Sequence, residues 1–110
     1  MGVRGSVVFP LIPLYNAMIE RIFRAEFRPD TTPEEREHLR RVWSAIPTEI
    51  AGIERFNLAI DGLHLTLRLV FASTAAKTHY CEHLYHKQTV DPLAEALLRQ
   101  ETYSLEEHDF

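Results

Sequence analysis

The 110-residue sequence has little cysteine, no long apolar run and no cluster of basic residues. Its one cysteine, Cys81, excludes an internal disulfide framework and indicates a reducing compartment such as the cytoplasm. No apolar stretch reaches the roughly 18 to 20 residues that a membrane-spanning helix needs. With 12 Lys+Arg against 16 Asp+Glu, the chain lacks the positive surface of a nucleic-acid binder. We therefore expect a cytoplasmic protein with neither nucleic acid nor membrane as partner.

The remaining composition, 45% hydrophobic and 25% charged, is that of one globular domain. Residues 1–17 differ from the rest, because they carry one charge, Arg4, and an apolar stretch broken by two prolines. They predict an extended arm that packs on the domain or on a partner subunit. A secretory signal is the weaker interpretation, since Ala17 offers the one candidate cleavage site. The domain itself is expected over residues 18–110.

Hydrophobic periodicity predicts the order strand, helix, strand, strand, helix, helix, strand. Alternating polar and apolar residues predict strands over 19–28, 53–60, 63–71 and 102–106. Helix-capping residues predict helices over 33–46, 73–84 and 91–99. Asp61-Gly62 predicts a tight hairpin between the second and third strands.

Because the apolar strand faces and the apolar helix stripes must cover each other, we expect an α+β fold with a four-stranded antiparallel sheet and helices on one face. Polar residues dominate the other sheet face: Arg24, Glu26, Arg28, Arg55, Asn57, His64, Thr66 and Arg68. Two alternatives are open for this face. It is either solvated, or covered by the same face of a second subunit, with charges paired across a twofold axis.

Reactive side chains are densest at residues 79–86, which hold three of the six histidines. On a continuous helix, His79, His83 and His86 would share one face and could hold a divalent transition metal. The alternative chemistry is acid–base catalysis, in which a histidine takes a proton and Tyr80 donates a hydrogen bond to a carbonyl. Tyr80 and His86 would diverge by about 120° on an unbroken helix. Their cooperation therefore requires a helix break.

Three segments resemble the stress-responsive A/B barrel (Dabb) family, and in particular its olivetolic acid cyclase-type polyketide cyclases. They are residues 18–35, 46–53 and 80–86, of which the last is similar to the family's tyrosine followed by His-Pro-x-His. The resemblance implies a ferredoxin-like protomer that pairs its sheet with a second copy to form a dimeric α+β barrel. It also implies a cyclase that uses neither cofactor nor metal and acts on a hydrophobic linear polycarbonyl chain.

By this resemblance, His86 is the general base of an intramolecular aldol closure and Tyr80 polarises the carbonyl. Further residues are expected to bind substrate or shape the site: His83, Arg21, Phe23, Phe27 and Trp43. Two alternatives are a non-enzymatic barrel that binds a small hydrophobic ligand and a small monooxygenase on the same fold.

The sequence departs from the family at several positions. Leu84 stands in place of the motif proline, so the helix break is not enforced by that residue. The acidic residue frequent in the last strand is replaced by Ser104, unless the alignment shifts to Glu106. The hairpin at Asp61-Gly62 is also tighter than the connection usual in the family.

Overall fold

The structure, a computed structural model, describes residues 17–109. The predicted arm at residues 1–17 lies outside the described residues, except for Ala17. Within the described range no helix is long and apolar enough to cross a membrane. The elements in chain order are β1 (Ile19–Phe27), α2 (Pro33–Ser44), α3 (Ile46–Glu49), β2 (Ile53–Asp61), β3 (His64–Phe71), α4 (Thr74–Glu82), the π-helical turn η1 (His86–Val90), α5 (Asp91–Leu97) and β4 (Leu98–Asp109).

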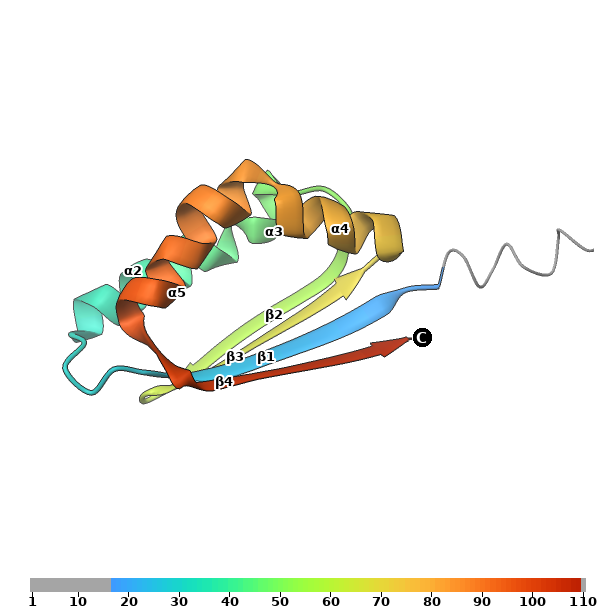
Figure 1. Cartoon of the computed structure of the whole chain (residues 1–110). Coiled ribbons are helices and arrows are strands. Elements are labelled where there is room, and N and C mark those ends of the chain that lie inside the picture. Colours follow the sequence, from blue (N-terminus) through green and yellow to red (C-terminus); the bar gives the residue numbers. More distant parts are fainter. Residues whose placement is uncertain (1–16, 110) are drawn as a thin grey trace, which may run out of the picture.

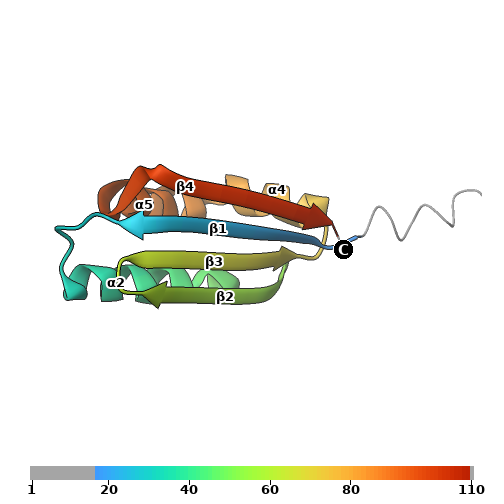
Figure 2. The same cartoon turned by 90° about the horizontal axis from the view of Figure 1, so that it is seen from below.

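The four strands form one antiparallel sheet in the order β2-β3-β1-β4. All helices lie on one face of this sheet, and the other face is open (Figure 1). Figure 2 shows that open face, with β1 and β3 in the centre and β2 and β4 at the edges. The predicted α+β architecture is therefore confirmed for the protomer.

Local sequence signals produce two of these features as predicted. At the start of α2, the Thr32 side chain accepts a hydrogen bond from the Glu35 amide at 3.1 Å, and Glu35 accepts one from the Thr32 amide at 2.8 Å. This reciprocal capping box satisfies two amides that a helix start leaves unpaired. In the predicted hairpin, Asp61 pairs with His64, and Gly62 adopts a positive φ of 61°.

The core lies between the sheet and the helices. Its fully buried side chains are all apolar or aromatic and come from both layers, among them Phe27, Leu39, Trp43, Ile46, Leu69 and Leu98. The described residues include no buried charged side chain. Burial of apolar area is therefore what joins helices to sheet, because it is the dominant favourable term in folding.

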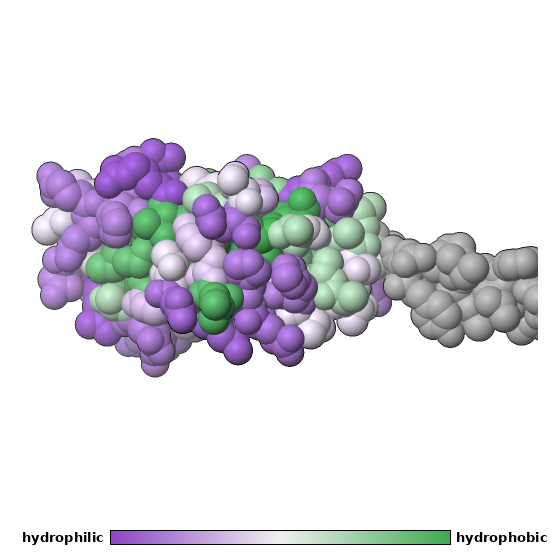
Figure 3. Space-filling view, turned by 90° about the horizontal axis from the view of Figure 1, so that it is seen from above, coloured by the Kyte–Doolittle hydropathy of each residue, from purple (hydrophilic) through white to green (hydrophobic). Residues whose placement is uncertain are grey.

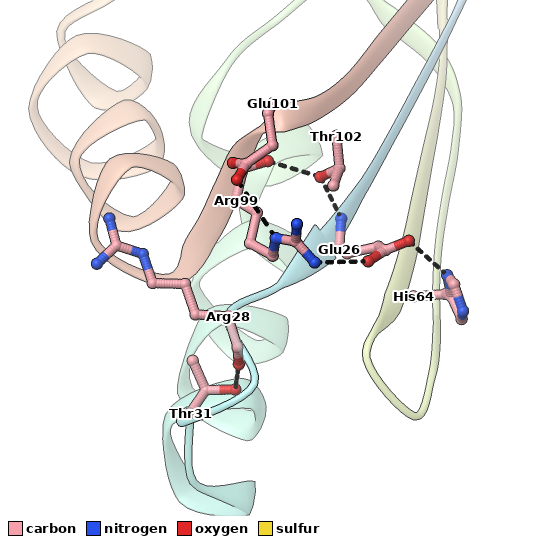
Figure 4. Close-up of polar contacts among 7 residues, drawn as sticks. All are labelled: Glu26, Arg28, Thr31, His64, Arg99, Glu101 and Thr102. Atoms are coloured by element: carbon pink, nitrogen blue, oxygen red, sulfur yellow. Dashed lines mark hydrogen bonds and ion pairs between the residues drawn. The ribbon is translucent and has the colours of Figure 1, made fainter.

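The charges of the open face pair within the chain. Glu20 pairs with Arg68 on the neighbouring strand, and Arg24 pairs with Glu106. Figure 4 shows Glu26 between Arg99 and His64, which lie on the two strands adjacent to β1. Its carboxylate lies 3.5 Å from an Arg99 nitrogen and 3.8 Å from His64 Nδ1. These three carboxylates, Glu20, Glu26 and Glu106, therefore each have an arginine partner within one protomer.

The last strand is longer than predicted and begins earlier. The predicted strand at 102–106 and the predicted helix end at residue 99 are both wrong, because α5 ends at Leu97 and β4 follows at once. Leu98 is fully buried opposite Phe27, so its burial favours sheet over a further helical turn.

An irregularity in β4 changes which of its residues face the helices. Glu26 pairs with Arg99 and Arg24 with Ser104, so two steps along β1 oppose five steps along β4. Thr102 closes this bulge, because its hydroxyl accepts from the Glu26 amide at 2.9 Å and donates to the Arg99 carbonyl at 2.6 Å (Figure 4). An odd number of extra residues inverts the alternation of faces. Tyr103 consequently points to the helix side.

The turn between α3 and β2 approaches α4 closely at Gly52, and a substitution there tests this contact. Its φ is +94°, and a Cβ there would lie 2.8 Å from the Ala76 Cβ. We predict that Gly52→Ala lowers the free energy of unfolding by about 1–3 kcal/mol, because strain and overlap add. Gly62→Ala, at φ +61° in open space, is the control and should cost less. Equal losses in urea denaturation would contradict the packing argument.

Candidate active site

Helix α4 ends two residues earlier than predicted, and this break organises the site. Ser73 caps its start by accepting from the Ala76 amide at 3.1 Å. At the other end, His83 adopts extended backbone angles, φ -67° and ψ 141°, which stop the helix at Glu82. Helical geometry resumes at Leu84 and Tyr85 and continues into the π-helical turn η1. The break forms although Leu84 occupies the place of the motif proline.

Hydrogen bonds hold the turn that a proline would otherwise favour. His83 Nδ1 accepts from the Tyr85 amide at 3.0 Å. The Tyr85 hydroxyl in turn donates to the Val42 carbonyl of α2 at 2.7 Å. Leu84 itself is 64% exposed and contributes no burial to the turn. His83 therefore stabilises the turn between α4 and η1, through its extended backbone and its bond to the Tyr85 amide.

The break brings Tyr80 and His86 together, with their ring centroids 4.4 Å apart and their planes at 61°. The alternative of a metal site loses its geometric basis, because it required an unbroken helix through three histidines. His79 and His83 lie 5.3 Å apart between ring centroids, but His86 has turned to Tyr80. Residues 17–109 contain no group of three ligands that could hold a metal ion.

His86 is a neutral, nearly buried base. Burial lowers its pKa below the ordinary value of 6.5, and the charges of Arg21 and Lys87 add to this, while Asp91 opposes it. His86 Nε2 lies 3.4 Å from Asp91 Oδ1. Nδ1 is buried and has no hydrogen-bond partner among the described residues. A neutral imidazole has one unprotonated ring nitrogen, which can accept a proton.

Tyr80 serves as a proton-bearing hydroxyl at this site. It is 3% exposed and packs against the Phe71 ring at 5.3 Å between centroids. Burial raises the pKa of Tyr80 well above its ordinary value of 10.0, although the positive charge of Arg21 lowers it in part. The hydroxyl therefore stays protonated near neutral pH and can donate a hydrogen bond.

Both rings line a pocket of about 230 Å³ between the helices and the sheet. Most of its wall is apolar: Phe23, Trp43, Leu67, Leu69, Val90, Ala94, Tyr103 and Leu105. Its remaining lining residues are Arg21, Tyr80, His86 and Asp91. Few polar groups in an apolar concavity are typical of a small-molecule site.

The rest of the surface includes a larger hollow to compare with this pocket. Seen from the helix side, hydrophobic residues gather in patches between hydrophilic ones (Figure 3). The larger hollow of about 590 Å³ is lined by residues 28–30 and 99–101, and neither Tyr80 nor His86 contributes to it. It has no histidine, tyrosine or cysteine in its wall, so its size does not make it the better candidate.

Arg21 extends from β1 into the pocket wall, and its guanidinium is bound to Glu107 of β4. Its Nε donates to Glu107 Oε2 at 2.8 Å, and Nη2 lies 2.6 Å from the same oxygen. Lys77 Nζ bonds the other oxygen of Glu107 at 3.0 Å. Burial alone would lower the pKa of Arg21, but its contacts with Glu107 and Cys81 raise it above the ordinary value. Arg21 is thus a fixed cation.

The structure brings five of the predicted site residues to one pocket and excludes two. Those in its wall are Arg21, Phe23, Trp43, Tyr80 and His86. Phe27 is not in the wall, because it lies four residues, roughly 13 Å, beyond Phe23 along β1 and is fully buried in the core. His83 is also absent from the wall, since its ring is used in the turn.

Seven of the lining residues were not predicted as site residues, and Asp91, Tyr103 and Leu105 are the three that most change the pocket. Asp91 was interpreted as a helix start, and its spacing of five residues from His86 gave no signal, because residues so spaced do not share a face of a regular α-helix. Tyr103 and Leu105 reach the pocket because of the β4 bulge, which no local pattern announces. The acidic partner of His86 therefore comes from α5, whereas Ser104 lies opposite Arg24 on β1.

No family model matches the chain, and no curated protein matches it significantly. Solved structures do. A dimeric ferredoxin-like protein from Thermobifida fusca has a TM-score of 0.75 at 13% identity, over 86% of this chain and 92% of the other. A Dabb family protein from Mesorhizobium loti has a TM-score of 0.67 at 19% identity, over 86% and 95%. A hydroxynitrile lyase from Passiflora edulis has a TM-score of 0.73 at 8% identity, over 86% and 94%.

These similarities define the class of the protein by its fold, which is that of the ferredoxin-like α+β proteins. The resemblance to the stress-responsive A/B barrel family is supported at that level, because a Dabb protein shares the architecture. At 8% to 19% identity, activity does not transfer with the fold. Function must therefore be argued from Tyr80, His86 and the pocket.

The electrostatics of the pair can be tested by following the His86 imidazole signals by NMR across pH. We predict that His86 titrates below 6.5 and that Asp91→Asn lowers its pKa further, because the carboxylate stabilises the imidazolium. Glu95→Gln, which removes an exposed acid from the same helix, is the matched control and should leave the titration unchanged. An Asp91→Asn protein with the same His86 titration as the parent would refute the assignment.

Proposed function

We propose that the protein is a cofactor-independent cyclase that closes a ring in a small hydrophobic polycarbonyl substrate by intramolecular aldol-type chemistry. One observation carries this proposal: Tyr80 and His86, 4.4 Å apart between ring centroids, line the same apolar pocket. A neutral base beside a protonated hydroxyl is the combination that proton abstraction next to a carbonyl requires.

The reaction begins when neutral His86 removes a proton from a methylene between two carbonyls. The C–H electron pair passes into an enolate, whose oxygen receives a hydrogen bond from Tyr80. The enolate carbon then attacks a second carbonyl of the same chain, forming the C–C bond and an alkoxide. The alkoxide takes back a proton from the His86 imidazolium, so atoms and charge balance without an added reactant.

Asp91 supports this cycle as a positioning residue. Its carboxylate, 3.4 Å from His86 Nε2, favours the tautomer that leaves Nδ1 unprotonated. It also stabilises the imidazolium that exists between the two proton transfers. Burial and Arg21 oppose protonation of the resting base. The opposing charges thus keep His86 neutral at rest and able to carry a proton briefly.

We further propose that the protein acts as a homodimer joined through the open sheet face. Two similar structures, from Thermobifida fusca and Bacteroides fragilis, are described as dimeric ferredoxin-like proteins. The ion pairs of this face are compatible with the proposal, because a paired charge is less costly to bury than an unpaired one. The site itself is built from one chain, so the dimer would support the fold rather than complete the catalytic pair.

The catalytic assignment is tested by incubating the protein with short poly-β-keto esters and following ring-closed products by mass spectrometry. We predict that His86→Ala abolishes cyclisation and that Tyr80→Phe reduces its rate about 10²-fold or more, as loss of an enolate-stabilising donor does. His79→Ala is the matched control, because this exposed histidine of the same segment does not line the pocket. Unchanged turnover in folded His86→Ala protein would remove the assignment.

The same assay separates the two alternatives. A barrel that only binds a hydrophobic ligand would take up the substrate and return it unchanged. A monooxygenase would consume oxygen and add it to the product, and a haem-dependent one would change the haem absorbance on mixing.

A further inference from the structure

The proposed cyclisation gives the cationic side chain of Arg21 no contact with the substrate. Arg21 is the one Lys or Arg among the described residues that line this pocket. Its side chain is only 17% exposed. A nearly buried cation in an apolar wall is costly unless an anion or several acceptors meet it.

Glu107 compensates the charge of Arg21 only in part, because Lys77 shares the same carboxylate. One carboxylate oxygen bonds Arg21 and the other bonds Lys77. The three side chains together carry one net positive charge. Arg24 and Glu106, the neighbouring pair on the opposite face of the same strands, are by contrast neutral as a pair. The positive charge of this cluster lies at the pocket, where the one other charged side chain among the described lining residues is Asp91, beside His86.

The guanidinium also keeps free donors. Of its five N–H groups, Nε–H and one on Nη2 are directed to Glu107, and one on Nη1 to Cys81 Sγ at 3.8 Å. One N–H on each terminal nitrogen remains, which is the donor set for a planar two-oxygen acceptor. The guanidinium carbon lies 5.8 Å from the Phe71 ring centroid, a cation–π contact that fixes its position.

We infer that Arg21 binds the carboxylate of a short linear acid whose apolar chain lies in the pocket beside Tyr80 and His86. The inference deepens the proposed function, on which it rests for the statement that this acid is the substrate. A carboxylate matches the one net positive charge of the cluster formed by Arg21, Lys77 and Glu107, whereas a phosphate would demand more donors than two. The cavity, about 230 Å³, has the liquid volume of roughly eight water molecules, which limits the chain to a small one.

Binding can be measured without turnover, using octanoate and its neutral analogue octanamide. Neither compound has the dicarbonyl methylene of the proposed reaction, so this experiment can fail while cyclisation succeeds, and the reverse. Trp43 is the single tryptophan of the chain and lines the pocket, so its fluorescence reports occupancy. We expect the parent protein to bind octanoate at least about tenfold more tightly than octanamide, as a charge-assisted hydrogen bond provides.

Arg21→Met should abolish this preference while octanamide affinity changes little. Arg24→Met is the matched control, because it removes an arginine from an Arg–Glu pair on the open face, and it should preserve the preference. Arg21→Lys, which keeps the charge but loses the planar donor pair, should retain an intermediate preference and serves if Arg21→Met does not fold. Equal affinity of the parent for both probes, no saturable octanoate binding, or an equal loss in Arg24→Met would overturn the inference.

Discussion

The end of helix α4 at Glu82 is the constraint on which the site depends. On an unbroken helix Tyr80 and His86 would point in different directions, and neither could assist the other. The extended backbone of His83 redirects the chain, and the hydrogen bond from the Tyr85 amide to His83 Nδ1 holds the turn. The contact between Tyr80 and His86 is therefore a property of the turn as much as of the two side chains.

Charge is distributed in the pocket so that each group keeps a distinct protonation state. Asp91 lies beside His86, and Arg21 lowers the pKa of both His86 and Tyr80. Burial acts in opposite directions on the two partners, because it disfavours the charged form of each. The imidazole remains neutral and the phenol remains protonated, which is the division of roles that acid–base chemistry needs.

Much of the fold could be predicted from the sequence, because its signals are local. The capping box at Thr32, the alternation of β3 and the hairpin at Gly62 each depend on a few neighbouring residues, and each is confirmed. The boundary between α5 and β4 was wrong, because Leu98 becomes a strand residue only through its pairing with Phe27 of β1. Phe27 lies outside the pocket wall for a related reason, since periodicity gives the face of a strand but not the position along it.

The sequence by itself determined the α+β class, the order of nearly all elements and the pairing of Tyr80 with His86 as a hypothesis. Tertiary structure decided that the helix breaks without a proline, that Asp91 is the acid beside His86, and that the β4 bulge directs Tyr103 to the pocket. The physical reason is the range of the interactions. Capping and periodicity act within a few residues, whereas strand register, pocket shape and shared charges such as Glu107 depend on segments that meet only when the chain is folded.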